Sequence, residues 1–96
     1  LEGLHVDTCA SGADLLSHPA LHQVRCIVLD YRMPDMDGFA VMNGLAAKGV
    51  HTPVILITGP MTGYIREQAS RLGASVVLEK PLLDGTLVDR IREFAT

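Results

Sequence analysis

The chain alternates between two kinds of hydrophobic pattern. Four short segments are rich in apolar and β-branched residues and predict strands at residues 4–9, 25–30, 54–58 and 75–79. The first of them alternates apolar with polar residues, as a strand buried on one face does. The other three are continuous apolar runs, which are typical of strands covered on both faces in a parallel sheet.

Four amphipathic segments separate or follow these strands, and most carry a signal at one end. Ser11 can cap the first helix at its N-terminus, and Pro19 closes that helix. Gly49 and Gly73 follow the next two and predict where they end. We expect helices at residues 11–18, 38–48, 61–72 and from about residue 83 or 84 onward. The last helix is expected to place four residues in the core: Leu87, Val88, Ile91 and Phe94.

Apolar strands that alternate with amphipathic helices predict an α/β fold, with a doubly wound parallel sheet and helices on both faces. A chain of 96 residues is long enough for one such domain, so we expect residues 1–96 to form a single domain. In sheets of this kind, ligands bind beyond the carboxyl ends of the strands. Asp30, Thr58 and Lys80 all lie at those ends, on three successive predicted strands.

Those three side chains suit phosphoryl transfer. A carboxylate such as Asp30 can accept a phosphoryl group, and the hydroxyl of Thr58 can hydrogen-bond one of its oxygens. Lys80 can neutralise charge that develops during transfer, and Pro81 restricts the backbone of the lysine. A divalent metal ion would be needed to bridge carboxylate and phosphate. Singly, Asp30 could cap a loop, Thr58 could be a turn residue and Lys80 a solvated charge, so it is their joint placement that favours a site.

Composition excludes several other classes. The net charge is −3, aromatic residues make up 4% of the chain and Trp is absent, so direct nucleic-acid binding is not expected. No segment has the apolar length of a membrane span, and no signal-peptide pattern is present. Cys9 and Cys26 lack metal-ligand or redox-motif spacing, which is consistent with free thiols in a reducing cytoplasm. The four histidines are scattered, so no pair of them has the spacing of metal ligands. We therefore expect a cytoplasmic protein that binds neither membranes nor nucleic acid directly.

Three stretches resemble the response-regulator receiver domain of two-component signalling: VLDYRMPDMDGFAVM at 28–42, PVILITG at 53–59 and GASVVLEKPL at 73–82. The string D-x-x-M-P-x-M-D-G, with a later T-G and K-P, is highly specific for that family. The resemblance implies a flavodoxin-like sheet with strand order 2-1-3-4-5. It also implies that a histidine kinase or a phosphotransfer protein phosphorylates Asp30 in the presence of Mg²⁺.

The resemblance also gives the other site residues expected roles. Thr58 would be the switch hydroxyl, and Lys80 would be the lysine that contacts the phosphoryl group. Asp30 and the backbone carbonyl of Arg32 would be metal ligands. Phosphorylation would then switch an output domain or a dimer state, through a surface formed by residues 61–95.

The first departure from the family pattern lies at the start of the chain. Receivers begin with a strand that ends in a metal-binding acidic pair, and the chain lacks both, so we expect a receiver truncated at its N-terminus and without strand 1. That strand could lie outside this chain, which is our preferred interpretation. It could also be lent by a neighbouring copy in a swapped dimer, or be bypassed if residues 4–9 dock directly on 25–30. In the family order those two strands are two positions apart, roughly 9–10 Å, so no disulfide between Cys9 and Cys26 is expected.

The second departure concerns the switch. Receivers commonly carry an aromatic residue three positions before the lysine, and this chain has Val77 there. Without a ring to rotate, the signal would be read through backbone shifts or a dimer interface. Pro60 and Arg32 flank the site as a bulky pair, which predicts slow loss of the phosphoryl group.

Two alternatives remain. A pseudo-receiver would have the same fold and bind protein partners without being phosphorylated, because the acidic pair is absent. A hydrolase with an aspartyl-phosphate intermediate, like the haloacid-dehalogenase-like phosphatases, needs a second Asp two residues after the nucleophile, where this chain has Arg32. No G-x-G-x-x-G follows a predicted strand, so a dinucleotide-binding enzyme is not indicated either. We therefore do not expect an enzyme.

Overall fold

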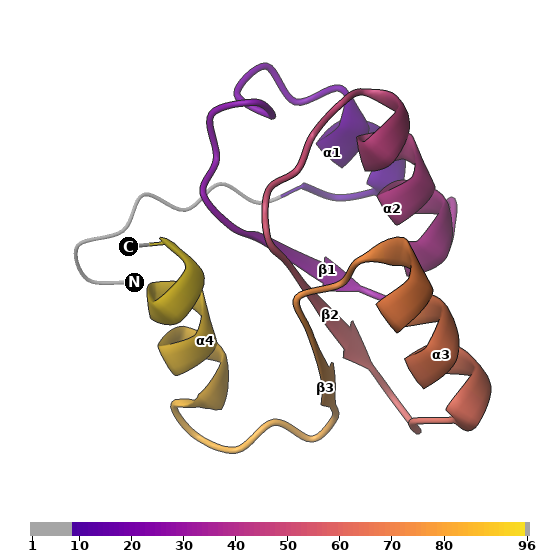
Figure 1. Cartoon of the computed structure of the whole chain (residues 1–96), viewed down its shortest axis with the longest axis vertical. Coiled ribbons are helices and arrows are strands. Elements are labelled where there is room, and N and C mark those ends of the chain that lie inside the picture. The colour runs from indigo at the N-terminus through magenta and orange to yellow at the C-terminus, as the bar shows by residue number, and fades with distance from the viewer. Residues whose placement is uncertain (1–8, 96) are drawn as a thin grey trace.

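The computed structural model describes residues 9–95, and at its centre is a parallel sheet of three strands (Figure 1). The strands are β1 (Ile27–Asp30), β2 (Val54–Thr58) and β3 (Val76–Glu79), and they lie side by side in that order. β2 has the predicted bounds, whereas β1 and β3 begin slightly later than predicted. The predicted strand at 4–9 lies outside the described residues except for Cys9, which is not in a strand.

Helices cover both faces of this sheet (Figure 1). α1 (Gly12–Leu16), α2 (Gly38–Ala47) and α3 (Gly63–Leu72) lie on one face, and α4 (Thr86–Ala95) lies on the other. The predicted doubly wound α/β fold is therefore confirmed. The order β1-β2-β3 corresponds to the last three strands of the expected 2-1-3-4-5 arrangement.

The helices begin and end at residues whose chemistry explains the boundaries. Ser11 caps α1 as predicted, because its Oγ accepts a hydrogen bond of 3.1 Å from the amide of Asp14. Thr62 caps α3 in the same way, and Gly73 ends that helix in a left-handed conformation with φ +89°. Gly85 also has a positive φ, of +82°, which a right-handed helix cannot contain. α4 therefore begins at Thr86, slightly later than predicted.

The main hydrophobic core lies between the sheet and the three helices α1, α2 and α3. Strand register places Leu29, Leu56 and Val77 in one row across the sheet. Leu56 is fully buried, Leu29 is 2% exposed, and both belong to the buried cluster against which Val77 packs. Alternation along a strand turns their neighbours to the opposite face. There Val28, on β1, is 41% exposed, although its partner Ile55 on β2 is fully buried.

α4 buries its apolar residues less deeply than the sequence predicted. Its predicted core residues all turn out to be half-buried, and none is buried: Leu87, Val88, Ile91 and Phe94. Figure 1 gives the reason, because α4 is the one helix of the described chain on its face of the sheet. A single helix cannot enclose its apolar side chains from both flanks, so each of them keeps some contact with water.

Gly38 begins α2 at a point where the helix packs tightly against the sheet. A Cβ atom at this position would lie 2.8 Å from Cδ1 of Leu56 and 3.1 Å from Cα of Tyr31. We expect Gly38→Ala to destabilise the fold by about 1–3 kcal/mol, because the added methyl overpacks this contact. Urea unfolding measures the change. Gly63→Ala is the matched control, since Gly63 begins α3 with nothing within 4 Å of its Cβ position. Equal losses from the two variants would contradict the packing argument.

Candidate functional site

The carboxyl ends of the three strands bring the predicted site residues to one edge of the sheet. Asp30 is the last residue of β1, Thr58 the last of β2, and Lys80 follows β3 directly. The amide of Tyr31 donates to the carbonyl of Ile57 over 2.7 Å, and the amide of Lys80 donates to the carbonyl of Thr58 over 2.8 Å. These ladder bonds hold the three strand ends level, so side chains far apart in sequence meet there.

Asp30 and Lys80 are in direct contact. Nζ of Lys80 lies 2.7 Å from Oδ2 of Asp30, and the side chains remain 51% and 41% exposed respectively. The other carboxylate oxygen, Oδ1, accepts a hydrogen bond of 3.1 Å from the amide of Arg32. Partial burial alone would raise the pKa of Asp30. The hydrogen bond from Lys80, the amide of Arg32 and the charge of Lys80 outweigh it and hold that pKa below its usual range.

Thr58 is placed between the other two but is not engaged with them. Thr58 is 2% exposed and is the last residue of the central strand β2. Within residues 9–95, no hydrogen bond joins its hydroxyl to the side chain of Asp30 or Lys80. The structure therefore brings the carboxylate and the ammonium group together and leaves the hydroxyl nearby without a bond to either.

The loop after Asp30 is held closed at its base. The amide of Gly38 donates to the carbonyl of Tyr31 over 2.7 Å, and Arg32 and Asp37 form an isolated antiparallel bridge. Asp37 also caps α2, because its Oδ1 accepts a hydrogen bond of 2.9 Å from the amide of Ala40. Backbone bonds therefore close the Met-Pro-Asp-Met-Asp-Gly loop between β1 and α2.

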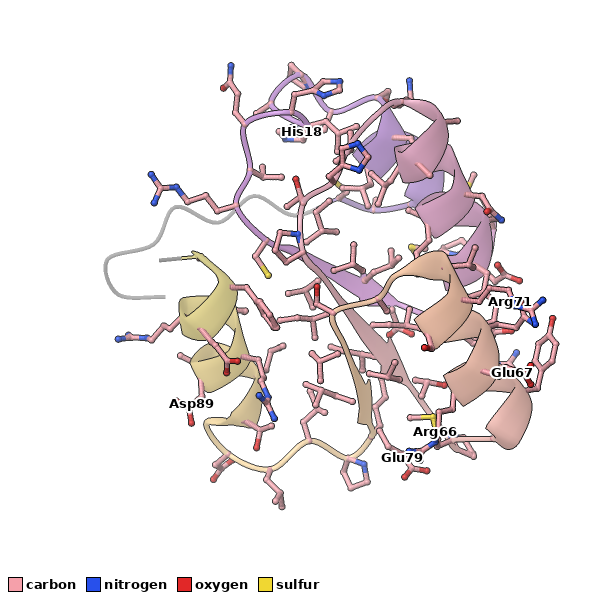
Figure 2. All side chains as sticks on the ribbon, in the orientation of Figure 1. His18, Arg66, Glu67, Arg71, Glu79 and Asp89 are labelled. Carbon is pink, nitrogen blue, oxygen red and sulfur yellow. The ribbon has the colours of Figure 1, made fainter. Side chains whose placement is uncertain are left out.

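Two acidic residues at this edge have contacts that sequence reasoning missed. Asp35 accepts two hydrogen bonds from α1: Oδ1 from the amide of Gly12 at 3.0 Å and Oδ2 from the amide of Ala13 at 2.9 Å. These amides hold the pKa of Asp35 below its usual range. Glu79 accepts a bond of 2.7 Å from the amide of Met61, and Figure 2 shows its side chain beside the N-terminal end of α3. Each pair is more than 15 residues apart in sequence, so no local spacing could have indicated it.

The described residues do not by themselves complete a Mg²⁺ site. Magnesium ions prefer oxygen ligands, and carboxylates are the usual protein contribution. Of the acids in the loop, Asp35 is committed to α1 and Asp37 to α2, which leaves the carboxylate of Asp30. Within residues 9–95, no group of three or more His, Cys, Asp or Glu residues could hold a metal ion. The expected ligation by Asp30 and the Arg32 carbonyl stays a prediction.

Cys26 comes directly before β1, at the opposite end of that strand from Asp30. Cys9 and Cys26 are both described, and no disulfide joins them. Burial raises the pKa of the Cys26 thiol. Within the described part of the chain, no helix is both long and apolar enough to cross a membrane.

Fold and site together define a class: a doubly wound α/β domain with an aspartate and a lysine paired beyond the strand ends. Comparison with known families agrees, since the model of the response regulator receiver domain matches residues 1–92. The chain belongs to this family. Receiver domains are signalling modules that interact with histidine kinases or phosphotransfer proteins, and they generally bind Mg²⁺.

Several of its curated relatives are named as transcriptional regulatory proteins. The chain is 37% identical over 89 residues to the C4-dicarboxylate transport transcriptional regulatory protein DctR of Rhodobacter capsulatus, covering 91% of this chain and 45% of DctR. It is 36% identical over 90 residues to the transcriptional regulatory protein FixJ of Azorhizobium caulinodans, covering 94% of this chain and 43% of FixJ. The chain thus spans less than half the length of these two relatives.

Solved structures show the same fold. The chemotaxis protein CheY4 of Vibrio cholerae superposes with a TM-score of 0.84 at 24% identity, over 96% of this chain and 78% of that one. The response regulator StyR superposes with a TM-score of 0.81 at 33% identity, over 98% of this chain and 48% of that one. The flavodoxin-like receiver fold is therefore established for this chain.

Proposed function

We propose that the chain is a phosphoacceptor receiver, in which Asp30 takes a phosphoryl group from a histidine kinase or a phosphotransfer protein. The observation that carries the proposal is the 2.7 Å contact between Asp30 and Lys80 at the exposed carboxyl edge of the sheet. Family membership supports it, since receivers interact with such donors. Residues 1–96 then act as one receiver domain in the cytoplasm and catalyse no independent reaction.

The site's own residues account for the acceptor chemistry. Asp30, like any aspartate whose pKa is not raised, is ionised at neutral pH and can act as a nucleophile. A carboxylate oxygen forms a bond to phosphorus while the bond from phosphorus to the donor's imidazole nitrogen breaks, and the electron pair returns to that nitrogen. Lys80 neutralises charge on the phosphoryl oxygens during this step. Thr58, whose hydroxyl has no bond to either side chain, would then turn toward the new group.

The proposed output is a change in an output domain or a dimer state. Relatives such as DctR and FixJ are named as transcriptional regulatory proteins, which supports control of transcription as the process served. This chain would not contact nucleic acid itself, because its net charge is −3. With Val77 in place of an aromatic residue, the change would pass through backbone shifts or through a contact between copies, strand exchange included.

A pseudo-receiver is the second candidate, and one observation favours it. Of the described acids near the expected metal site, Asp35 and Asp37 are bonded to helix amides, which leaves Asp30 as the one carboxylate for the metal, and metal affinity falls when charged ligands are few. In that case the domain would bind protein partners through the same surface without a phosphoryl group on Asp30.

Intact-mass spectrometry after incubation with acetyl phosphate and Mg²⁺ separates the two candidates. We expect one phosphoryl group on the wild-type chain and none on Asp30→Asn, because the amide cannot form the acyl phosphate. Asp84→Asn is the matched control, since Asp84 is an exposed aspartate outside the site and its replacement leaves the adduct in place. An unmodified wild-type chain would leave open the pseudo-receiver and a receiver whose acidic pair lies outside residues 1–96, and the same test on a chain extended at its N-terminus would separate these two. An adduct that persists in Asp30→Asn would place the acceptor elsewhere.

A further inference from the structure

Asp35 joins the tip of the acceptor loop to α1 through two hydrogen bonds. Its two carboxylate oxygens accept from Gly12 and Ala13, the first two residues of the helix, at 3.0 and 2.9 Å. Charge-assisted bonds of this kind are stronger than bonds between neutral groups. The lowered pKa of Asp35 agrees with a carboxylate that stays ionised at the joint.

Close packing supports the same joint. Gly12 is buried, and a Cβ atom there would lie 2.6 Å from Cγ of Met36 and 2.8 Å from Cγ2 of Val41. Met36, the residue after Asp35, therefore packs directly against the start of α1. Two hydrogen bonds to Asp35 and a tight packing contact with Met36 therefore fix α1 to the acceptor loop.

The same loop also holds Asp30. At its base, the amide of Arg32 donates to Oδ1 of Asp30, and Arg32 pairs with Asp37 across the loop. Asp35 lies between the two bridge partners in sequence, so the joint with α1 sets how the closed loop is oriented. A shift of the tip would therefore reach the Arg32 amide and, through its hydrogen bond, the acceptor carboxylate.

We propose that Asp35 is a positioning residue, which ties α1 to the acceptor loop and thereby fixes the hydrogen bond between Arg32 and Asp30. The position of α1 then affects the acceptor, so a partner that moves α1 changes the rate at which Asp30 reacts. The consequence for reaction rests on the proposed function, whereas the coupling between α1 and Arg32 does not.

Amide hydrogen exchange measured by NMR tests the coupling, with three variants compared to the wild-type chain. Asp35→Asn removes the charge and one acceptor oxygen from the joint. Gly12→Ala opens the same joint by steric pressure and leaves the carboxylate unchanged. Asp14→Asn is the control, because Asp14 lies in the first turn of α1, is exposed, and its replacement removes the same charge without touching the loop.

We expect the Arg32 amide to exchange several-fold faster in Asp35→Asn and Gly12→Ala and at the wild-type rate in Asp14→Asn. The initial rate of Asp30 modification by acetyl phosphate should fall several-fold in the same two variants. Faster exchange confined to Gly12 and Ala13, with Arg32 unchanged, would reduce Asp35 to a helix cap and overturn the proposal. If Asp30 of the wild-type chain is never modified, the proposed function fails, and the exchange of Arg32 still decides whether the coupling exists.

Discussion

Lys80→Met is expected to slow the transfer of a phosphoryl group from acetyl phosphate to Asp30 by about a hundredfold, the usual loss when one charged or polar group that stabilises a transition state is removed. The methionine keeps a flexible side chain of similar length but cannot neutralise charge on the phosphoryl oxygens. It also removes the hydrogen bond and the positive charge that hold the pKa of Asp30 down. The initial rate of mass increase measures the effect.

The chain offers a matched control for this prediction. Lys48 is the other lysine, and it is exposed at the C-terminal end of α2. Lys48→Met changes the net charge equally and should leave the rate unchanged. If Lys80→Met reacts as fast as the control, the ion pair with Asp30 is structural only, and the role of Lys80 in transfer is wrong.

Leu56→Ala is expected to lower the free energy of unfolding by about 3–5 kcal/mol, because a leucine to alanine change in a packed core removes buried apolar surface and leaves a cavity. Leu56 is fully buried at the centre of the middle strand, between Leu29 and Val77. Total stabilities of small domains are about 5–15 kcal/mol, so much of the chain would be unfolded in moderate urea.

Leu83→Ala is the control for the core prediction. Leu83 is 80% exposed in the loop before α4, and its truncation should change the free energy of unfolding by less than about 0.5 kcal/mol. Urea titrations of both variants, followed by circular dichroism, give the comparison. Similar losses at the two positions would show that the row through Leu56 is not the main source of stability.

The sheet and the site residues at its carboxyl edge could be predicted because the sequence patterns that indicate them are local. A continuous apolar run such as residues 54–58 has one interpretation when helical patterns flank it, and β2 has those bounds. Once the strands are taken as parallel, their carboxyl ends must share one edge. Asp30 and Lys80 were therefore expected to be close, and the 2.7 Å contact confirms that expectation of proximity.

Other features depended on contacts that no sequence pattern reports. The burial of α4 is set by how many neighbours share its face, so its amphipathic spacing predicted the correct side but overestimated the depth. The bond from Met61 to Glu79 joins the loop before α3 to the last residue of β3 through a backbone amide, a donor that every residue except proline carries. The joint between Asp35 and α1 is of the same kind, because an aspartate in a loop has many possible donors, and only the folded chain determines that the amides of Gly12 and Ala13 are the two it bonds.

The crowding of acids at the carboxyl edge of the sheet also governs how other molecules arrive there. The edge and its loop carry four acids and two bases: Asp30, Asp35, Asp37 and Glu79 against Arg32 and Lys80. At physiological ionic strength the field of these charges extends about 8 Å into solution. It opposes the approach of a small anionic phosphate donor and favours a protein whose docking surface is basic. Ionic strength therefore acts in opposite directions on the two kinds of donor.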